Sequence, residues 1–181
     1  LVQRIQALPL PNHPLVGSGL MAPIQVTSLP MPSTSTQPYE CSIVYDRRLV
    51  PGETLDGILD EYQRGLAGLD NWSVEVAQEG YQTYTGVELR SADFHPGWAL
   101  EPASEWQSEA MKALTSAGLE PETFIAPYCT NGSASGGERG IPTLIFGPSG
   151  IEQAHIVDES LEIAELLRGA AGYAALAKGL T

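Results

Sequence analysis

The chain has 181 residues, and its 22 acidic against 9 basic side chains give a formal net charge of −13. An acidic chain without a basic stripe excludes nucleic acid and anionic membrane surfaces as preferred partners, and no apolar run is long enough to cross a bilayer. A hydrophobic content of 43% suffices for a folded core, and two cysteines are too few for a disulfide scaffold. These features predict a folded cytoplasmic protein of one or two domains.

The first 80 residues carry alternating helix and strand signals. A short helix is expected over 1–8, ended by Pro9, and Thr54 is expected to cap a second helix. The alternation of side chains along the chain predicts three strands, over 22–28, 39–45 and 72–76. The order helix, strand, strand, helix, strand is that of a ferredoxin-like unit, β-α-β-β-α-β, whose first strand is missing.

The second half carries the signals of a layered α/β domain. Ser104 and Gln107 form a capping box at the start of a helix expected over 104–117, and a long final helix is expected from about Asp158. Two strands are expected, over 124–126 and 143–146. The second of these is a continuous apolar run, which fits a strand buried on both faces of a parallel sheet.

Histidines are the first candidates for chemistry, because imidazole binds metals and transfers protons near neutral pH. Two of the three, His13 and His95, lie in predicted loops and are interpreted as surface residues. His155 follows the predicted buried strand, at the end of a sheet where α/β proteins bind ligands. Asp158 and Glu159 are close enough in sequence to orient its imidazole. Alternatively, the two carboxylates favour the helix dipole and His155 is a bystander.

Two further segments carry groups suited to a carboxylate ligand. The loop 130–137 offers hydroxyls, an amide and many backbone N–H groups, which suit a carboxylate or an oxyanion, although it could equally be a connector. Arg47 and Arg48 stand together at a predicted strand end. One of them is expected to neutralise Asp46 or Glu53, and the other is suited to a substrate carboxylate.

Two ordered motifs connect these candidates. Residues 41–54 contain the pattern D-R-R-x-x-x-G-E-T, and residues 140–159 contain G-I-P-T-x-x-F-G-P followed by A-H-x-x-x-E. Together they resemble the co-catalytic zinc amidohydrolase and metallopeptidase family that includes acetylornithine deacetylase, succinyl-diaminopimelate desuccinylase, aminoacylase and glutamate carboxypeptidase. The residues Cys-Thr-Asn-Gly at 129–132 are most similar to the subgroup related to selenium-metabolism peptidase-like proteins.

The resemblance implies two interleaved domains. Residues 1–78 would be an incomplete, ferredoxin-like lid used for dimerisation, and residues 79–181 the C-terminal part of a zinc-binding α/β catalytic domain. In that family the other zinc ligands and the bridging carboxylate precede the lid. The missing first strand and the absence of an initiator methionine fit this expectation, which makes the chain the later portion of a longer protein.

Functional residues carry over position by position. His155 would be the late zinc ligand and Glu159 its supporting residue, while Arg48 would hold the substrate carboxylate. Thr130, Asn131 and Gly132 would line the substrate pocket, with Asn131 replacing a commoner aspartate. No catalytic residue of the family falls within this chain.

The activity implied is hydrolysis of an amide bond in a small peptide or an N-acyl amino acid. Two zinc ions, with cobalt or manganese as alternatives, would lower the pKa of a shared water that attacks the carbonyl. The 181 residues alone are expected to be inactive. Two alternatives stay open: a non-catalytic dimerisation or ligand-binding module derived from the family, and a plain α/β domain with structural histidines.

Overall fold

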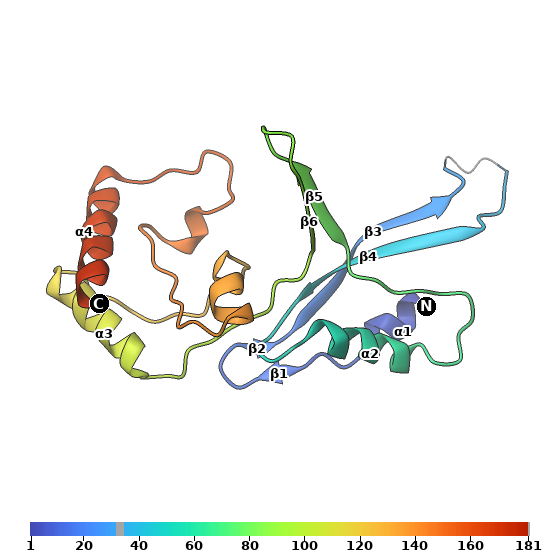
Figure 1. The fold of residues 1–181 in the computed structure, drawn as a ribbon, viewed down its shortest axis with the longest axis horizontal. Helices are drawn as coiled ribbons and strands as arrows, with labels where there is room; N and C mark the ends of the chain where they lie inside the picture. Colours follow the sequence, from blue (N-terminus) through green and yellow to red (C-terminus); the bar gives the residue numbers. More distant parts are fainter. Residues whose placement is uncertain (32–34, 181) are drawn as a thin grey trace. The chain divides into compact units, whose positions relative to one another are not determined.

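The computed structural model describes residues 1–31 and 35–180, which belong to two compact units, Leu1–Ala99 and Leu100–Thr181 (Figure 1). The domain boundary predicted after Gln78 concerns the interleaved domains of the longer family proteins, and it stays a prediction. No helix in the described part of the chain is both long enough and apolar enough to span a membrane.

The first unit combines helices with small antiparallel sheets. Its helices are α1 (Val2–Gln6) and α2 (Leu55–Gly65), and its strands are β1 (Asn12–His13), β2 (Gly17–Ser18), β3 (Leu20–Leu29), β4 (Glu40–Arg48), β5 (Gln78–Gln82) and β6 (Glu88–Ala92). The strands pair as β1–β2, β3–β4 and β5–β6. This mixture of elements agrees with the predicted mixed α/β class.

The long β3–β4 pair confirms the two strands predicted before residue 46. Its register runs from Leu20 opposite Arg48 to Leu29 opposite Glu40, with a bulge where Ile24 stands between paired Pro23 and Gln25. A proline lacks the N–H that a sheet ladder uses, so an irregularity beside it is expected.

Helix α2 begins directly after Thr54, the residue predicted to cap it. The Thr54 hydroxyl accepts the Gly57 N–H at 3.2 Å, which satisfies one of the unpaired amides of the first turn. Tyr62 of α2 and Leu66 at its C-cap are buried together with Ile5 of α1. Trp72 packs against this core, and its indole N–H donates to the Leu69 carbonyl at 3.0 Å.

The strand predicted over 72–76 is wrong, and a hairpin follows it instead. Trp72 and Val74 do alternate toward the core, but these residues have no ladder partner in the described structure, and a strand requires one. The next residues form the β5–β6 hairpin, closed by the Thr83 N–H donating to the Val87 carbonyl at 2.9 Å. Its side chains are mostly exposed, so it carries no apolar alternation to predict it.

The second unit is built around two packed helices. Its elements are α3 (Glu105–Ser116), a π-helical turn η1 (Ser133–Glu138), a 3-10 turn η2 (Ile151–Gln153) and α4 (Ile163–Gly179). The capping box of α3 is confirmed: Ser104 Oγ accepts the Gln107 N–H at 3.4 Å, and Gln107 Oε1 accepts the Ala103 N–H at 2.8 Å. Trp106 of α3 has a buried indole nitrogen.

Glycines on α4 let the preceding segment approach the helix closely. A β-carbon at Gly172 would lie 2.5 Å from the Phe146 ring, and one at Gly169 would lie 3.0 Å from Pro148. The Phe146 ring also meets Tyr173 edge-on, with centroids 5.1 Å apart, and the Tyr173 hydroxyl donates to the Phe146 carbonyl. Aromatic rings favour this edge-to-face geometry.

Three elements predicted for the second unit differ from the structure. Residues 124–126 and 143–146 form no strand in the part of the chain described. The apolar run 143–146 lies in a segment without helix or strand ahead of Gly147 and Pro148, and Leu144 in it is 40% exposed. The final helix begins at Ile163 rather than near Asp158. Asp158 has a φ of 61°, which a right-handed helix excludes, and Glu162, with an extended ψ of 139°, is the N-cap.

Candidate functional site

A buried charge cluster fixes the end of β4 against α2. Arg47 Nη2 lies 2.7 Å from Glu53 Oε1 and 2.8 Å from Glu61 Oε2, and the three side chains are 8%, 9% and 20% exposed. The second oxygen of Glu53 accepts the Val50 N–H at 2.7 Å. The cluster therefore joins a strand, the following turn and a helix.

The electrostatics of this cluster make Arg47 a permanent structural cation. Burial by itself would lower the pKa of Arg47, but hydrogen bonds and charges from Glu61 and Glu53 outweigh burial and raise that pKa. Burial also raises the pKa of the neighbouring Tyr45 and Tyr62 hydroxyls. With two carboxylates on its guanidinium, Arg47 is committed to the fold rather than to a ligand.

Arg48, by contrast, faces solvent. Its side chain is 52% exposed and lies 2.8 Å from Asp46, which is itself 38% exposed. An exposed ion pair of this kind contributes little and exchanges readily. The sequence predicts that one of the two arginines neutralises Asp46 or Glu53. In the structure Arg47 pairs with Glu53 and Arg48 pairs with Asp46, and Arg48 is the more exposed of the two guanidinium groups.

Thr130, Asn131 and Gly132 form one tight turn that leads into η1. The Thr130 hydroxyl accepts the Gly132 N–H at 3.1 Å, and the Asn131 carbonyl accepts the Ala134 N–H at 3.1 Å. The Asn131 side chain is exposed. These two hydrogen bonds fix the backbone of the loop that carries the Asn131 amide, directly before η1.

His155 and Glu159 are brought together, although not as expected from sequence. Glu159 Oε2 accepts the backbone N–H of His155 at 3.2 Å rather than a proton of the imidazole. Both residues are exposed, and no hydrogen bond involves the imidazole nitrogens within the described residues. An open imidazole on a backbone held by a carboxylate fits the role of a metal ligand. Arg48 belongs to the first unit, and the other predicted site residues belong to the second.

A second group of ligand-type side chains was not found from sequence. One donor atom each of Glu79, Asp93 and His95 lies within 4.8 Å of the others, and His95 Nε2 is 3.2 Å from Asp93 Oδ1. His95 is exposed, as predicted for a surface residue. The group was missed because the hairpin was missed, although the Asp-x-His spacing was available as a signal.

Comparisons with known proteins agree with the two motifs. Residues 12–179 match the sequence pattern of Peptidase family M20/M25/M40. The chain is 32% identical to the uncharacterized protein YgeY of Escherichia coli over 152 residues, which are 80% of this chain and 36% of that protein. It is 31% identical to an N-formyl-4-amino-5-aminomethyl-2-methylpyrimidine deformylase of Halalkalibacterium halodurans over 137 residues, 71% of this chain and 31% of that enzyme.

The chain thus spans about a third of the length of these relatives. No solved structure matches it significantly. The family match covers nearly the whole chain, includes both motifs, and confirms the resemblance stated from the residues. A peptidase family with a deformylase among the relatives supports amide-bond hydrolysis at the level of the family. The chain belongs to Peptidase family M20/M25/M40.

Proposed function

We propose that this chain is part of a metal-dependent hydrolase that cleaves amide bonds in small peptides or N-acyl amino acids. The observation that supports this most directly is the family match over residues 12–179, which contains both the D-R-R and the A-H-x-x-x-E motifs. The deformylase relative acts, by its name, on an N-formyl compound, and a formamide is the smallest N-acyl amide. The cytoplasmic location expected from the composition stays a prediction.

Arg48 of the first unit and the loop 130–132 of the second unit have separate roles in this proposal. Arg48 binds the substrate carboxylate through its exposed guanidinium, exchanging its weak pair with Asp46. Thr130, Asn131 and Gly132 line the pocket, where the exposed Asn131 amide hydrogen-bonds to substrate.

His155 would hold a zinc ion through its open imidazole, and Glu159 keeps the His155 backbone in place. When bound, a pair of zinc ions supplies an activated water and polarises the amide carbonyl, and cobalt or manganese offers the same chemistry. These 181 residues contain one of the several zinc ligands that such a site requires, so we expect the chain alone to be inactive.

The test uses the full-length protein that contains these residues. Release of free amine from N-formyl, N-acetyl and dipeptide substrates is measured with wild type, His155→Ala and Arg48→Ala. We expect His155→Ala to abolish metal-dependent release. We expect Arg48→Ala to raise KM by about tenfold or more for substrates with a free carboxylate, because a charged hydrogen bond is lost.

Two comparisons make this test specific. C-terminally amidated substrates should show the same KM with wild type and Arg48→Ala, since they lack the charge that Arg48 binds. Arg168→Ala removes another exposed arginine, paired with Glu165 at 3.0 Å, and should change neither substrate series. Unchanged hydrolysis in His155→Ala would refute the zinc assignment, and unchanged KM in Arg48→Ala would refute the carboxylate assignment.

The lid and the homodimer belong to the same proposal. We expect the first unit to be part of a ferredoxin-like lid whose β3 side meets a second copy. Leu20, Ile24 and Val26 of β3 are each about two-thirds exposed, at 66%, 65% and 65%. An apolar strand left open in this way is prone to pair with another chain. Light scattering should show a dimer that Val26→Lys weakens, whereas Val157→Lys, at a 90% exposed position outside the lid, leaves it intact.

A further inference from the structure

We propose that Glu79, Asp93 and His95 form a binding site for a divalent transition-metal ion, separate from the family site that includes His155. Each side chain contributes one donor atom, and the three donors lie within 4.8 Å of one another. One imidazole with two carboxylates suits zinc, cobalt or manganese better than calcium or magnesium, which prefer oxygen ligands alone. This inference does not depend on the hydrolase activity proposed above.

The hairpin register places Glu79 and Asp93 on one face, and a turn after Asp93 brings His95 to them. Glu79 stands opposite Ser91 in the β5–β6 ladder, so these two side chains share a face. The pairing continues past the end of β6, because the Asp93 N–H donates to the Ala77 carbonyl at 2.8 Å. Side chains alternate along paired strands, so Asp93, two residues beyond Ser91, returns to the same face as Glu79. The chain then turns, with the Phe94 N–H donating to the Ala92 carbonyl at 2.8 Å, and the His95 donor atom lies within 4.8 Å of the two carboxylates.

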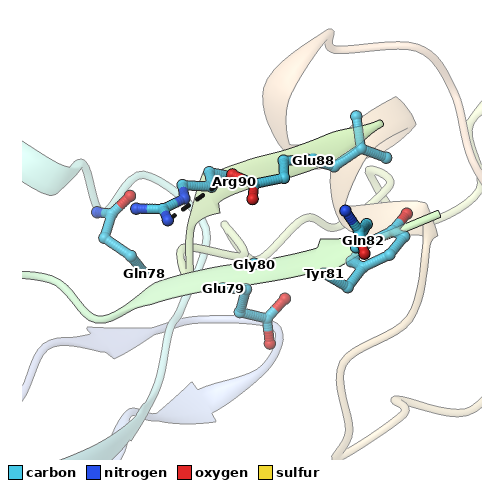
Figure 2. A pocket seen from close by; sticks show the side chains of 8 residues that line it. Gln78, Glu79, Gly80, Tyr81, Gln82, Glu88 and Arg90 are labelled. Atoms are coloured by element: carbon cyan, nitrogen blue, oxygen red, sulfur yellow. Dashed lines mark ion pairs between the residues drawn. The ribbon is translucent and has the colours of Figure 1, made fainter. Parts of the chain in front are cut away.

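Arg90, the arginine of this hairpin, lies on the face opposite to Glu79. Arg90 stands opposite Gly80 and pairs loosely with Glu88 at 3.9 Å. Figure 2 shows the Glu79 carboxylate on the side of β5 turned away from the Arg90 guanidinium. Within the group of three side chains, the two carboxylates have only the His95 imidazole beside them, and its Nε2 lies 3.2 Å from Asp93 Oδ1. A divalent cation would balance this local negative charge.

The segment that carries two of the ligands is held in place by backbone packing. A β-carbon at Gly97 would lie 2.7 Å from the Leu49 carbonyl oxygen and 3.0 Å from the Val50 carbonyl carbon. Glycine permits this close approach, which anchors the chain two residues after His95 to the turn that follows β4. One ligand thus comes from β5, and the other two come from an anchored segment after β6.

Metal binding would require small side-chain rotations. Donor atoms bonded to one zinc ion at about 2.1 Å lie roughly 3.4 Å apart. In the structure the three donor atoms lie within 4.8 Å of one another, so they would have to move closer together to bind the ion. The His95 and Asp93 side chains are 49% and 45% exposed, so both can rotate, and solvent can complete the coordination. The ion would join β5 to the segment after β6 and stabilise a hairpin that has only two strands.

The test measures metal binding directly on the 181-residue chain. The chain is stripped with a chelator, and zinc binding is followed by calorimetry for wild type, His95→Gln and Glu79→Gln. We expect each variant to lose one equivalent of zinc or to bind it at least tenfold more weakly. Two matched controls, Glu88→Gln on the same hairpin and His155→Gln in the family motif, should retain that equivalent.

A second readout locates the ion. Substoichiometric Mn²⁺ should broaden the amide signals of residues 78–80 and 92–95 first in wild type, and not in His95→Gln. Retention of the full zinc stoichiometry and affinity by His95→Gln, or loss of the only equivalent in His155→Gln, would overturn the proposal. Neither result bears on the hydrolase proposal, which the kinetic measurements test separately. Likewise, a negative kinetic result would not count against this metal site.

Discussion

The Glu53 carboxylate joins Arg47 to the turn that follows its strand. One oxygen of Glu53 accepts Arg47 Nη2 at 2.7 Å, and the other accepts the Val50 N–H at 2.7 Å. The motif D-R-R-x-x-x-G-E-T thus pairs its second-position arginine with its own glutamate. This arrangement leaves the third-position arginine, Arg48, facing solvent.

The two adjacent arginines should differ sharply in their effect on stability. Arg47→Ala leaves Glu53 and Glu61 buried without their cation, and removal of one member of such a cluster costs about 3–5 kcal/mol. Arg48→Ala removes an exposed pair and should cost roughly 0.5 kcal/mol or less. Urea unfolding of both variants measures the difference. Equal losses would show that the buried cluster does not hold the strand end.

The first unit should lose stability in alkaline solution. Burial raises the pKa of Tyr62 above its ordinary value of 10.0, so this hydroxyl stays protonated in the folded state where the unfolded chain ionises. The contribution of the Tyr62 hydroxyl to the free energy of unfolding is therefore complete below about pH 10, and it is lost as the pH rises through the folded-state pKa. Urea unfolding at pH 8 and pH 11 should show a smaller loss for Tyr62→Phe than for wild type. Tyr84→Phe, at a fully exposed position, should behave as wild type.

Gly172→Ala should destabilise the second unit despite the better helix propensity of alanine. The added methyl would lie 2.5 Å from Phe146, whose ring is held by Tyr173. Overpacking typically costs about 1–3 kcal/mol, against a propensity gain of about 1 kcal/mol. The loss should shrink in a Phe146→Leu background, and a double-mutant cycle measures this coupling. A cycle without coupling would contradict the contact.

Removal of each helix cap should act within its own unit. Thr54→Ala and Ser104→Ala each remove a side chain that accepts an N–H of the first turn, at a cost of about 1 kcal/mol. Amide exchange should accelerate in α2 for Thr54→Ala and in α3 for Ser104→Ala. Faster amide exchange in both helices of either variant would contradict this expectation and show that the two units open together.

Local signals in the sequence were enough to predict the helices. Thr54 and Ser104 cap α2 and α3 where their side-chain oxygens predict, because a cap satisfies its neighbours within three residues. Side-chain alternation predicts the strands 22–28 and 39–45, and in the structure these two strands pair with each other. The final helix was placed too early, since nothing in the residue types at His155 and Asp158 requires a positive φ.

Strands that require partners far away in the sequence cannot be predicted from local patterns of residues. The run 143–146 has the composition of a buried strand, but composition does not show whether a neighbouring strand is there to pair with it. In this structure the run forms no strand, and it leads into a segment that packs against α4. The same limit applies to the candidate site. Motifs predict Arg48 and His155 as candidates. The difference between the buried Arg47 and the exposed Arg48 depends on packing, which the sequence does not encode locally.

The positions of the tryptophans provide each unit with an optical reporter. Trp72 packs against the core of the first unit, and Trp106, the one tryptophan after residue 99, has a buried indole nitrogen in α3 of the second. Replacement of Trp72 and Trp98 by phenylalanine would leave fluorescence from the second unit alone, and replacement of Trp106 would leave fluorescence from the first. Unfolding of the two halves of the chain can then be followed separately in one molecule.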